Sequence, residues 1–144
     1  MKIRDLLDKK GRETVTVGAF ETLSSVFSIL AEHRIGALMV CDKDMRVEGI
    51  ISERDLVAAI AKNGEEALSQ SVKSFMTSDV ITSEEEDTVH QVMERMTAGR
   101  FRHMPVVTDD GKLSGILSIG DLVKQRIEDV EREADNIRAY IHSV

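Results

Sequence analysis

Two stretches of the chain carry hydrophobic residues at positions i, i+3, i+4 and i+7, which is the spacing of one face of an α-helix. Both stretches follow a short polar turn and begin at a threonine, Thr22 in the first and Thr88 in the second. The pattern predicts two amphipathic helices whose apolar faces belong to the core. Those faces consist of Leu23, Val26, Phe27 and Leu30 in the first helix, and of Val89, Val92, Met93 and Met96 in the second.

Short runs rich in β-branched and apolar residues flank both helices, and such runs favour strands. One strand is predicted before each helix, over residues 14–17 and 80–82. Two more are predicted after the first helix, over residues 37–41 and 46–51. In the second copy the turn between the corresponding strands, residues 108–111, is a strong hairpin signal because it ends in Asp-Gly. A closing helix follows, so each unit is predicted to be β-α-β-β-α.

These two units are copies of one another, because residues 14–57 align with residues 80–123 at a constant offset of 66 without a gap. An N-terminal segment, residues 3–8, is echoed by residues 72–77. A unit of this size can hardly cover its own core, so the two copies are expected to pack on each other. We therefore predict an α+β fold of two repeats with pseudo-twofold symmetry, and two related ligand clefts at their interface.

The repeat also sets expected boundaries along the chain. Asn63-Gly64 ends the last helix of the first copy, since glycine commonly follows a helix end. The expected segments are a first repeat over residues 1–64, a linker and lead-in over residues 65–79, a second repeat over residues 80–124, and a C-terminal helix extension over residues 125–144.

The closing helix of the second copy is predicted to be much longer than that of the first. From Asp121 onward neither Gly nor Pro interrupts the pattern, and apolar residues recur at spacings of 4, 3, 4, 3 and 4, as in a coiled coil. A helix of about five to six turns results. It either folds back on its own domain or, as we prefer, packs against a partner chain. Its apolar strip consists of Val123, Ile127, Val130, Ala134, Ile137 and Ile141.

Composition narrows the functional classes. Hydrophobic residues make up 42% of the chain and charged residues 31%, which is ordinary for a globular protein. No segment suits a membrane span or a signal peptide, which predicts a cytoplasmic protein. The net charge of −7 argues against nucleic-acid binding. Cys41 lies in an apolar run and is expected to fill a strand, while the 4 histidines lack metal-ligand spacing, so no metal site is predicted.

One motif closes each copy, where a strand ends and a helix begins. A structural interpretation is that its serine caps the helix and its aspartate, at the third helical position, satisfies free N–H groups, a contribution of about 1 kcal/mol. A functional interpretation is that the helix start attracts a phosphate, while the two carboxylate oxygens accept both hydrogen bonds of a ribose diol. The motif is Gly49-Ile50-Ile51-Ser52-Glu53-Arg54-Asp55-Leu56-Val57 in the first copy and Gly115-Ile116-Leu117-Ser118-Ile119-Gly120-Asp121-Leu122-Val123 in the second.

Two such repeats, each closing on Gly, two hydrophobic residues and Ser-x-x-Asp-Leu-Val, resemble a tandem pair of cystathionine-beta-synthase (CBS) domains, or Bateman module. The resemblance covers residues 1–125, and it is specific because the repeat, the motif and the order of elements agree. It implies a regulatory energy sensor that binds an adenosyl ligand in the clefts between the domains: AMP, ADP, ATP, NAD or S-adenosylmethionine. It also implies a flat homodimer and a regulated partner protein.

The resemblance further implies which residues bind the ligand. Asp55 and Asp121 would bind ribose, with Ser52 and Ser118 as phosphate or ribose neighbours and Ile119 beside the second serine. Small residues on the adenine side would let a flat ring approach the backbone closely. The adenine side would consist of Val15, Thr16, Gly36 and Ala37 in one copy, and of Ile81, Thr82, Arg102, His103, Met104 and Pro105 in the other.

Charge placement differs between the two expected sites. Arg54 stands inside the first motif, whereas its equivalent in the second is Gly120. The second copy instead has Arg100, Arg102 and His103, where the first has Arg34, Gly36 and Ala37. Because the whole chain is acidic, such local cations would supply most of the attraction for an anionic ligand.

Three functional classes follow. The first is a stand-alone regulatory module that binds an adenosyl nucleotide and signals to a partner protein. The alternative is a ligand-free structural dimerisation scaffold, in which Ser-x-x-Asp only caps helices. An enzyme is disfavoured, because the chain has no Ser/His/Asp order, no closely paired acid and base, and no phosphate-binding glycine loop.

Overall fold

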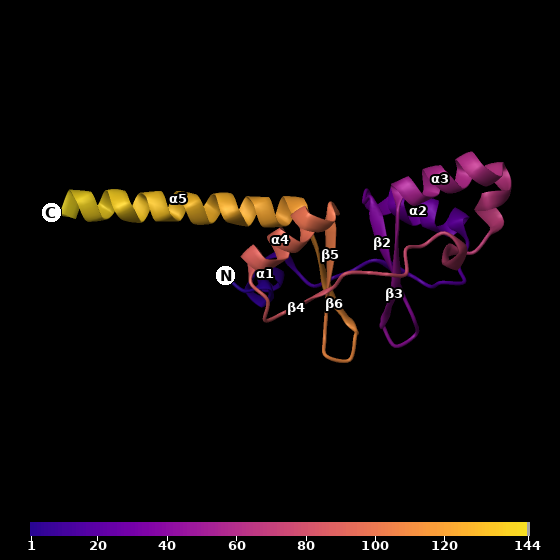
Figure 1. The fold of residues 1–144 in the computed structure, drawn as a ribbon, viewed down its shortest axis with the longest axis horizontal. Helices are drawn as coiled ribbons and strands as arrows, with labels where there is room; N and C mark the ends of the chain where they lie inside the picture. The colour runs from indigo at the N-terminus through magenta and orange to yellow at the C-terminus, as the bar shows by residue number, and fades with distance from the viewer. Residues whose placement is uncertain (144) are drawn as a thin grey trace.

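Two three-stranded sheets, one from each half of the chain, form the centre of the molecule (Figure 1). This computed structural model describes residues 1–143. In each sheet the first strand pairs parallel with the second, and the second pairs antiparallel with the third. The first sheet consists of β1 (Thr16–Val17), β2 (Ala37–Cys41) and β3 (Val47–Ser52), and the second of β4 (Ser83–Glu84), β5 (His103–Val107) and β6 (Leu113–Ser118).

Helices surround these sheets, and the helix after each opening strand begins in the same way in the two halves. Thr22 and Thr88 accept hydrogen bonds from the amides of Ser25 and Gln91, as expected for helix N-caps. None of the helices within residues 1–143 is long and apolar enough to cross a membrane. The helices are α1 (Ile3–Lys10), α2 (Leu23–His33), α3 (Glu53–Asn63), α4 (Val89–Gly99) and α5 (Ile119–Ser143), with short 3₁₀ helices η1 (Gly64–Ser69) and η2 (Val72–Ser74) between the halves.

The opening strand of the second half differs from the prediction. It covers Ser83–Glu84 instead of residues 80–82, and its counterpart in the first half is only Thr16–Val17. Ser83 lies opposite Val106, so residue 82 would stand opposite Pro105. Proline has no amide hydrogen to donate to a neighbouring strand, and this favours pairing that begins one residue later.

The apolar face of α2 is narrower than the sequence pattern suggested. Leu23, Val26 and Leu30 are buried as predicted, but Phe27 is 38% exposed. In α4 the corresponding Met93 is partly buried against the core of its own half. The sheet therefore covers only part of the expected stripe on α2.

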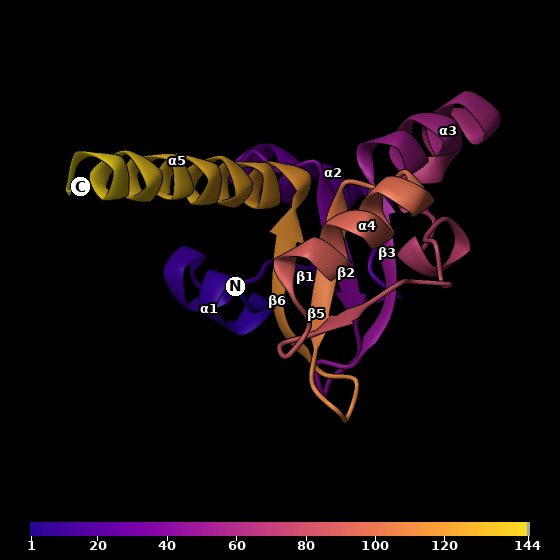
Figure 2. The ribbon, with the colours of Figure 1, turned by 60° about the vertical axis from the view of Figure 1, so that its left-hand side comes forward.

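The core of each half contains one segment that comes from the other half of the sequence. Ile3, Leu6 and Leu7 of α1 belong to the core of the second half, whereas Val72 belongs to that of the first. Figures 1 and 2 show α1 beside the second sheet, although α1 precedes the first sheet in the sequence. The halves are thus interleaved, and the segment boundaries set by the sequence repeat stay a prediction.

Two glycines permit this exchange, because an exchanged segment packs against each of them where a larger residue would have its side chain. A Cβ on Gly115 would stand 2.7 Å from Cδ2 of Leu7, and a Cβ on Gly49 would stand 2.7 Å from Sδ of Met76. Leu7 and Met76 are equivalent in the echo between residues 3–8 and 72–77. The echo therefore corresponds to a repeated contact in space.

The halves also meet at their hairpin turns, which lie together at one end of the molecule (Figure 1). The amide of Val47 donates to the carbonyl of Gly111 over 3.1 Å, and the amide of Leu113 donates to the carbonyl of Met45 over 2.9 Å. Arg46 and Lys112 form an antiparallel bridge between them. These paired contacts relate the halves by the predicted pseudo-twofold symmetry.

Helix α5 projects far from both sheets (Figures 1 and 2). It has 25 residues, about seven turns, and so exceeds the predicted length. Leu122 and Gln125 are buried against the body, and Lys9 of α1 donates to Gln125. The apolar strip beyond them is open, since Ile137 is 60% and Ile141 64% exposed.

Candidate functional site

A cleft of about 660 Å³ lies between the halves and contains the first copy of the motif. One wall comes from β2, β3 and the start of α3, and the other from the lead-in to β4 and from the segment between α4 and β5. The lining residues are Gly36, Ala37, Ile50, Ser52, Glu53, Arg54 and Asp55 on the first wall, and Thr77, Asp79, Val80, Ile81, Arg100, Phe101, Arg102, His103 and Pro105 on the second.

Ser52 and Asp55 form the capping box that the structural interpretation predicts. Oδ2 of Asp55 accepts hydrogen bonds from the amide of Ser52 over 2.8 Å and from its hydroxyl over 3.1 Å. The Asp55 amide donates back to the Ser52 hydroxyl. Within residues 1–143, Oδ1 of Asp55 takes part in no further hydrogen bond, so the capping role leaves an acceptor available.

Cations from both halves line the same cleft. Arg54 lies in the first turn of α3, one residue before Asp55. Arg100 and Arg102 come from the other half, where Arg100 ends α4 in the left-handed conformation with φ of 56°. Guanidinium groups bind phosphate oxygens through paired N–H donors. The cleft therefore combines a carboxylate with anion-binding groups on the facing wall.

His103 stands in the cleft as a neutral side chain. Burial is the largest cause that lowers its pKa below the ordinary 6.5, and the nearby charges of Lys10 and Arg102 act in the same direction. The charge of Asp121 opposes them. A neutral imidazole has one donor and one acceptor nitrogen, so His103 can hydrogen-bond a ligand without adding charge.

The second copy of the motif has the same backbone geometry but a different neighbour. The amide of Ser118 donates to Oδ2 of Asp121 over 2.8 Å, and the amide of Asp121 donates to the Ser118 hydroxyl. Lys10 of α1 forms an ion pair with the same carboxylate over 2.7 Å. Burial alone would raise the pKa of Asp121, but the hydrogen bonds from Lys10 and Ser118 lower it overall.

The structure brings about half of the residues predicted from the sequence into one cleft. It joins the first motif to the second half, because Ser52, Arg54 and Asp55 face Ile81, Arg102, His103 and Pro105. Gly36 and Ala37 line the same cleft. The predicted residues that do not line it are Val15, Thr16, Thr82, Met104, Ser118, Ile119 and Asp121.

Packing explains several of these positions. Met104 is fully buried in the core of the second half, and Ile119 packs against that core. Val15 packs against the core of the first half. The alternation of side chains along a strand places neighbours on opposite faces, so a contiguous sequence run cannot line one cleft throughout.

Several lining residues were missed by the sequence analysis. Thr77 lies there because it pairs with Ile50 through two backbone hydrogen bonds of 2.9 Å. Asp79 and Val80 follow directly and enter the cleft with it. No local pattern marks this segment, since its position depends on the exchange of segments between the halves. The residues missed are Ile50, Glu53, Thr77, Asp79, Val80 and Phe101, whereas Arg100 is one of the expected cations.

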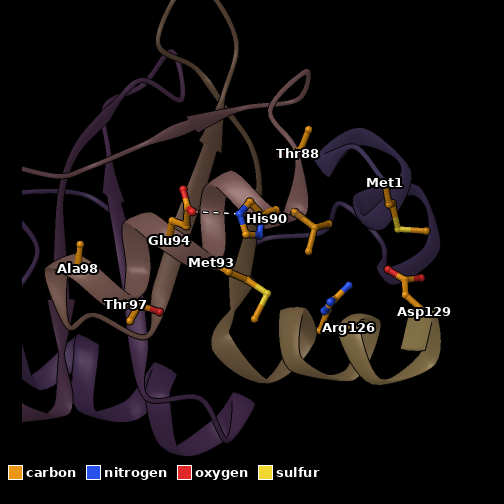
Figure 3. Close-up of a pocket in the computed structure, with 10 residues that line it drawn as sticks. Met1, Thr88, His90, Met93, Glu94, Thr97, Ala98, Arg126 and Asp129 are labelled. Carbon is orange, nitrogen blue, oxygen red and sulfur yellow. Dashed lines mark ion pairs between the residues drawn. The ribbon is translucent and has the colours of Figure 1, made fainter. Parts of the chain in front are cut away.

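A second hollow of about 590 Å³ lies between α4 and α5 (Figure 3). His90 and Glu94 of α4 form an ion pair on one side, and Arg126 and Asp129 of α5 lie on the other. Met93 extends between them (Figure 3). None of the residues predicted to bind a ligand lines this hollow, so we place the candidate site in the interdomain cleft.

Cys41 is buried in strand β2. Burial raises the pKa of Cys41 to about 11, so its thiol stays protonated at neutral pH and fills the strand, as predicted. Across residues 1–143 no three His, Cys, Asp or Glu side chains gather as metal ligands would.

Comparison with protein families gives two matches along the chain. The model of the CBS domain matches residues 3–62 and again residues 72–128. These matches follow the two repeats of the sequence and leave the outer part of α5 uncovered.

Two of the similar proteins cover most of the chain. A protein of Acidianus ambivalens is 37% identical over 74% of this chain, and the mitochondrial CBS domain-containing protein CBSX3 of Arabidopsis thaliana is 31% identical over 96%. The chain spans 63% and 71% of their lengths. Inosine-5′-monophosphate dehydrogenase of Methanocaldococcus jannaschii is 30% identical, but the match covers only 22% of that enzyme.

Solved structures share the fold. The CBS-domain protein ATU1752 from Agrobacterium tumefaciens is 48% identical with a TM-score of 0.81, covering 88% of this chain and 99% of that one. The CBS domain pair of protein MJ0100 is 26% identical with a TM-score of 0.77, covering 87% of this chain and 98% of its own. That structure is a complex with 5′-methylthioadenosine and S-adenosyl-L-methionine.

Proposed function

The chain belongs to the CBS domain family, and on that premise we propose that it is a regulatory module whose interdomain cleft binds an adenosyl nucleotide. The observation that carries the proposal is the position of Asp55, at a helix start inside a cleft whose facing wall holds arginines. The complex of MJ0100 with two adenosyl ligands supports this ligand class. AMP, ADP, ATP, NAD and S-adenosylmethionine all carry the required adenosyl group.

The ligand would use the polar groups of both walls. The ribose diol would donate to the carboxylate of Asp55, and the Ser52 hydroxyl lies next to it. Arg54, Arg100 and Arg102 would attract phosphates. The adenine ring would lie against the small Gly36-Ala37 segment and the apolar side chain of Ile81.

A ligand in this position would connect the halves, because its ribose contacts Asp55 on one wall and its phosphates reach Arg100 and Arg102 on the other. Binding would then favour one relative packing of the two halves over another, and this is how the module would signal to a partner protein. The match to inosine-5′-monophosphate dehydrogenase covers only a small part of that enzyme, which supports a regulatory rather than a catalytic role. A cytoplasmic location is part of the same proposal.

Isothermal titration of the purified chain with AMP, ATP, NAD and S-adenosylmethionine tests the proposal. At a hundredfold excess over the dissociation constant, a ligand stabilises the fold by about 2.7 kcal/mol, so thermal unfolding gives a second readout. We expect Asp55→Ala to abolish binding. Asp121→Ala is the matched control, since it removes the same capping contact outside this cleft. Absence of binding to all four compounds would favour the scaffold alternative.

We also propose that two copies associate through α5. Its strip of exposed apolar residues continues beyond the body, and the hollow beside α4 adds further apolar surface next to it. A helix that leaves one face uncovered is stabilised when a second helix covers that face. Sedimentation of a chain truncated after Gln125 tests this. If the truncated chain is still a dimer, α5 is excluded as the dimer contact.

A further inference from the structure

The two copies of the motif are nearly identical in their own hydrogen bonds. In both, the serine amide donates to Oδ2 of the aspartate over 2.8 Å, and the aspartate amide donates back to the serine hydroxyl. A difference in how available the two aspartates are must therefore come from groups other than this serine and aspartate.

Within the described residues, the second of these two aspartates forms an ion pair and the first does not. The ammonium of Lys10 lies 2.7 Å from Oδ2 of Asp121 and also donates to the carbonyl of Ile116 over 2.7 Å. The two side chains are 35% and 26% exposed, so water only partly screens the pair. Among residues 1–143, no lysine or arginine forms an ion pair with Asp55. Lys10 thus neutralises, through Oδ2, the carboxylate that a ribose would need in the second copy.

The packing of α1 holds Lys10 in this position. Leu7 lies on Gly115 in strand β6, and Lys10 follows one turn later, above the end of that strand. In the other half Met76 lies on Gly49, but there the chain continues without a helix, and the backbone of Thr77 pairs with Ile50. The carbonyl of Ile50 therefore accepts a hydrogen bond from the backbone amide of Thr77, whereas the equivalent carbonyl of Ile116 accepts one from the ammonium of Lys10.

The equivalent positions carry opposite charges. Continuing the echo between residues 3–8 and 72–77 by two residues aligns Lys10 with Asp79, an acidic residue that lines the first cleft. An acid cannot pair with Asp55. The first carboxylate is consequently left for a ligand, whereas the second is neutralised by the chain itself.

We propose that Lys10 closes the second copy of the site by holding Asp121, so that each chain binds one nucleotide, at Asp55. This inference rests on the proposed function and adds the number of ligands and the residue that determines it. A ribose diol offers neutral donors, whose hydrogen bonds to a carboxylate are weaker than those of an ammonium held in place. A ribose is therefore bound less strongly by Asp121, whose charge Lys10 neutralises, than by Asp55, which forms no ion pair within residues 1–143.

Isothermal titration with AMP tests this on five forms of the full chain. We expect one molecule of AMP per chain for the wild type and two for Lys10→Met, which keeps the length of the side chain and removes its charge. Asp55→Ala should bind none, and the double variant Lys10→Met, Asp55→Ala should bind one. Lys9→Met is the matched control, because Lys9 pairs with Glu128 on α5 and lies on the same helix; it should still bind one.

The outcomes separate this inference from the proposed function. Two equal sites in the wild type, or a single site that persists in Lys10→Met, would overturn the role of Lys10 while leaving nucleotide binding intact. No binding by any form would overturn both. Carbon NMR of the Asp121 carboxyl supplies a readout without ligand: its pKa should rise in Lys10→Met and stay lowered in Lys9→Met, and an unchanged value in Lys10→Met would contradict the proposed contact.

Discussion

The two glycines that open the motif differ in what lies against them. A Cβ at Gly49 would stand 2.8 Å from the backbone oxygen of Thr77 as well as against Met76, whereas the three atoms nearest to a Cβ at Gly115 all belong to the side chain of Leu7. A backbone neighbour cannot move as a side chain can. The cost of an added methyl group should therefore differ between two positions that the sequence repeat makes equivalent.

We expect Gly49→Ala to lower the free energy of unfolding by about 1–3 kcal/mol, the usual cost of overpacking, and Gly115→Ala to lower it less. Urea denaturation followed by circular dichroism measures both. Gly120→Ala is the control, since its nearest neighbour is the hydroxyl of Ser118 at 3.6 Å and alanine suits a helix better than glycine. Equal losses at residues 49 and 115 would contradict the argument.

His103 makes stability depend on pH in a defined window. Its pKa is lowered in the folded chain, mainly by burial, so as the pH falls below about 6.5 the unfolded chain takes up a proton before the folded chain does. Stability should therefore decline below that pH. His103→Gln should remove this part of the decline in chemical denaturation at pH 5 to 8. Replacing the exposed His142 by Gln should leave it unchanged, and an identical slope in His103→Gln would refute the assignment.

Residue by residue, the sequence predicted the parts of the site that depend on local spacing. Ser52 and Asp55 are three positions apart at a strand-to-helix junction, and their capping geometry follows from that spacing. Lys10 could not be predicted, because it reaches Asp121 only through the docking of α1 on the opposite half. Side chains that come together by tertiary packing leave no periodic signal in the sequence.

Among the elements, helices were easier to predict than the short opening strands. Helix starts at Thr22 and Thr88 follow from side-chain caps, which act within one turn. The opening strands contain 2 residues each, and their position depends on which neighbouring residue can donate to them. Pro105 shifts that pairing in the second half, an effect that strand propensity does not include.

Helix α5 yields a prediction of its own. Ile137 is 60% exposed in the single chain and lies in the middle of the outer apolar strip. A charge there would be buried in the proposed helix pair, so Ile137→Asp should shift the chain from dimer to monomer in analytical ultracentrifugation. Asn136→Asp is the matched control, because it adds the same charge one residue away from the strip. A dimer that survives Ile137→Asp would remove α5 from the interface.

Across the whole molecule, the exchange of segments ties the two halves together. Leu7 is fully buried in the core of the second half although it lies at the start of the chain, and Val72 is fully buried in the core of the first. The hairpin contacts between Val47 and Gly111 add a second connection. If the core of one half unfolds, the segment that it holds from the other half of the sequence loses its buried contacts. The core of the other half is then disturbed as well.

The molecule should consequently unfold in one cooperative transition, even though its sequence consists of two repeats. Leu7→Ala and Val72→Ala each leave a cavity, and Leu7→Ala should lower the stability of the whole molecule by about 2–5 kcal/mol. Hydrogen exchange of the amides in β2 and β5 measures both cores in one experiment. If the halves are coupled as described, each substitution reduces protection in both strands equally, whereas Val57→Ala, at a site 69% exposed, changes neither. If Leu7→Ala reduces protection in β5 alone, the two halves unfold separately. The exchanged segments would then not be what couples a bound ligand to the relative packing of the halves.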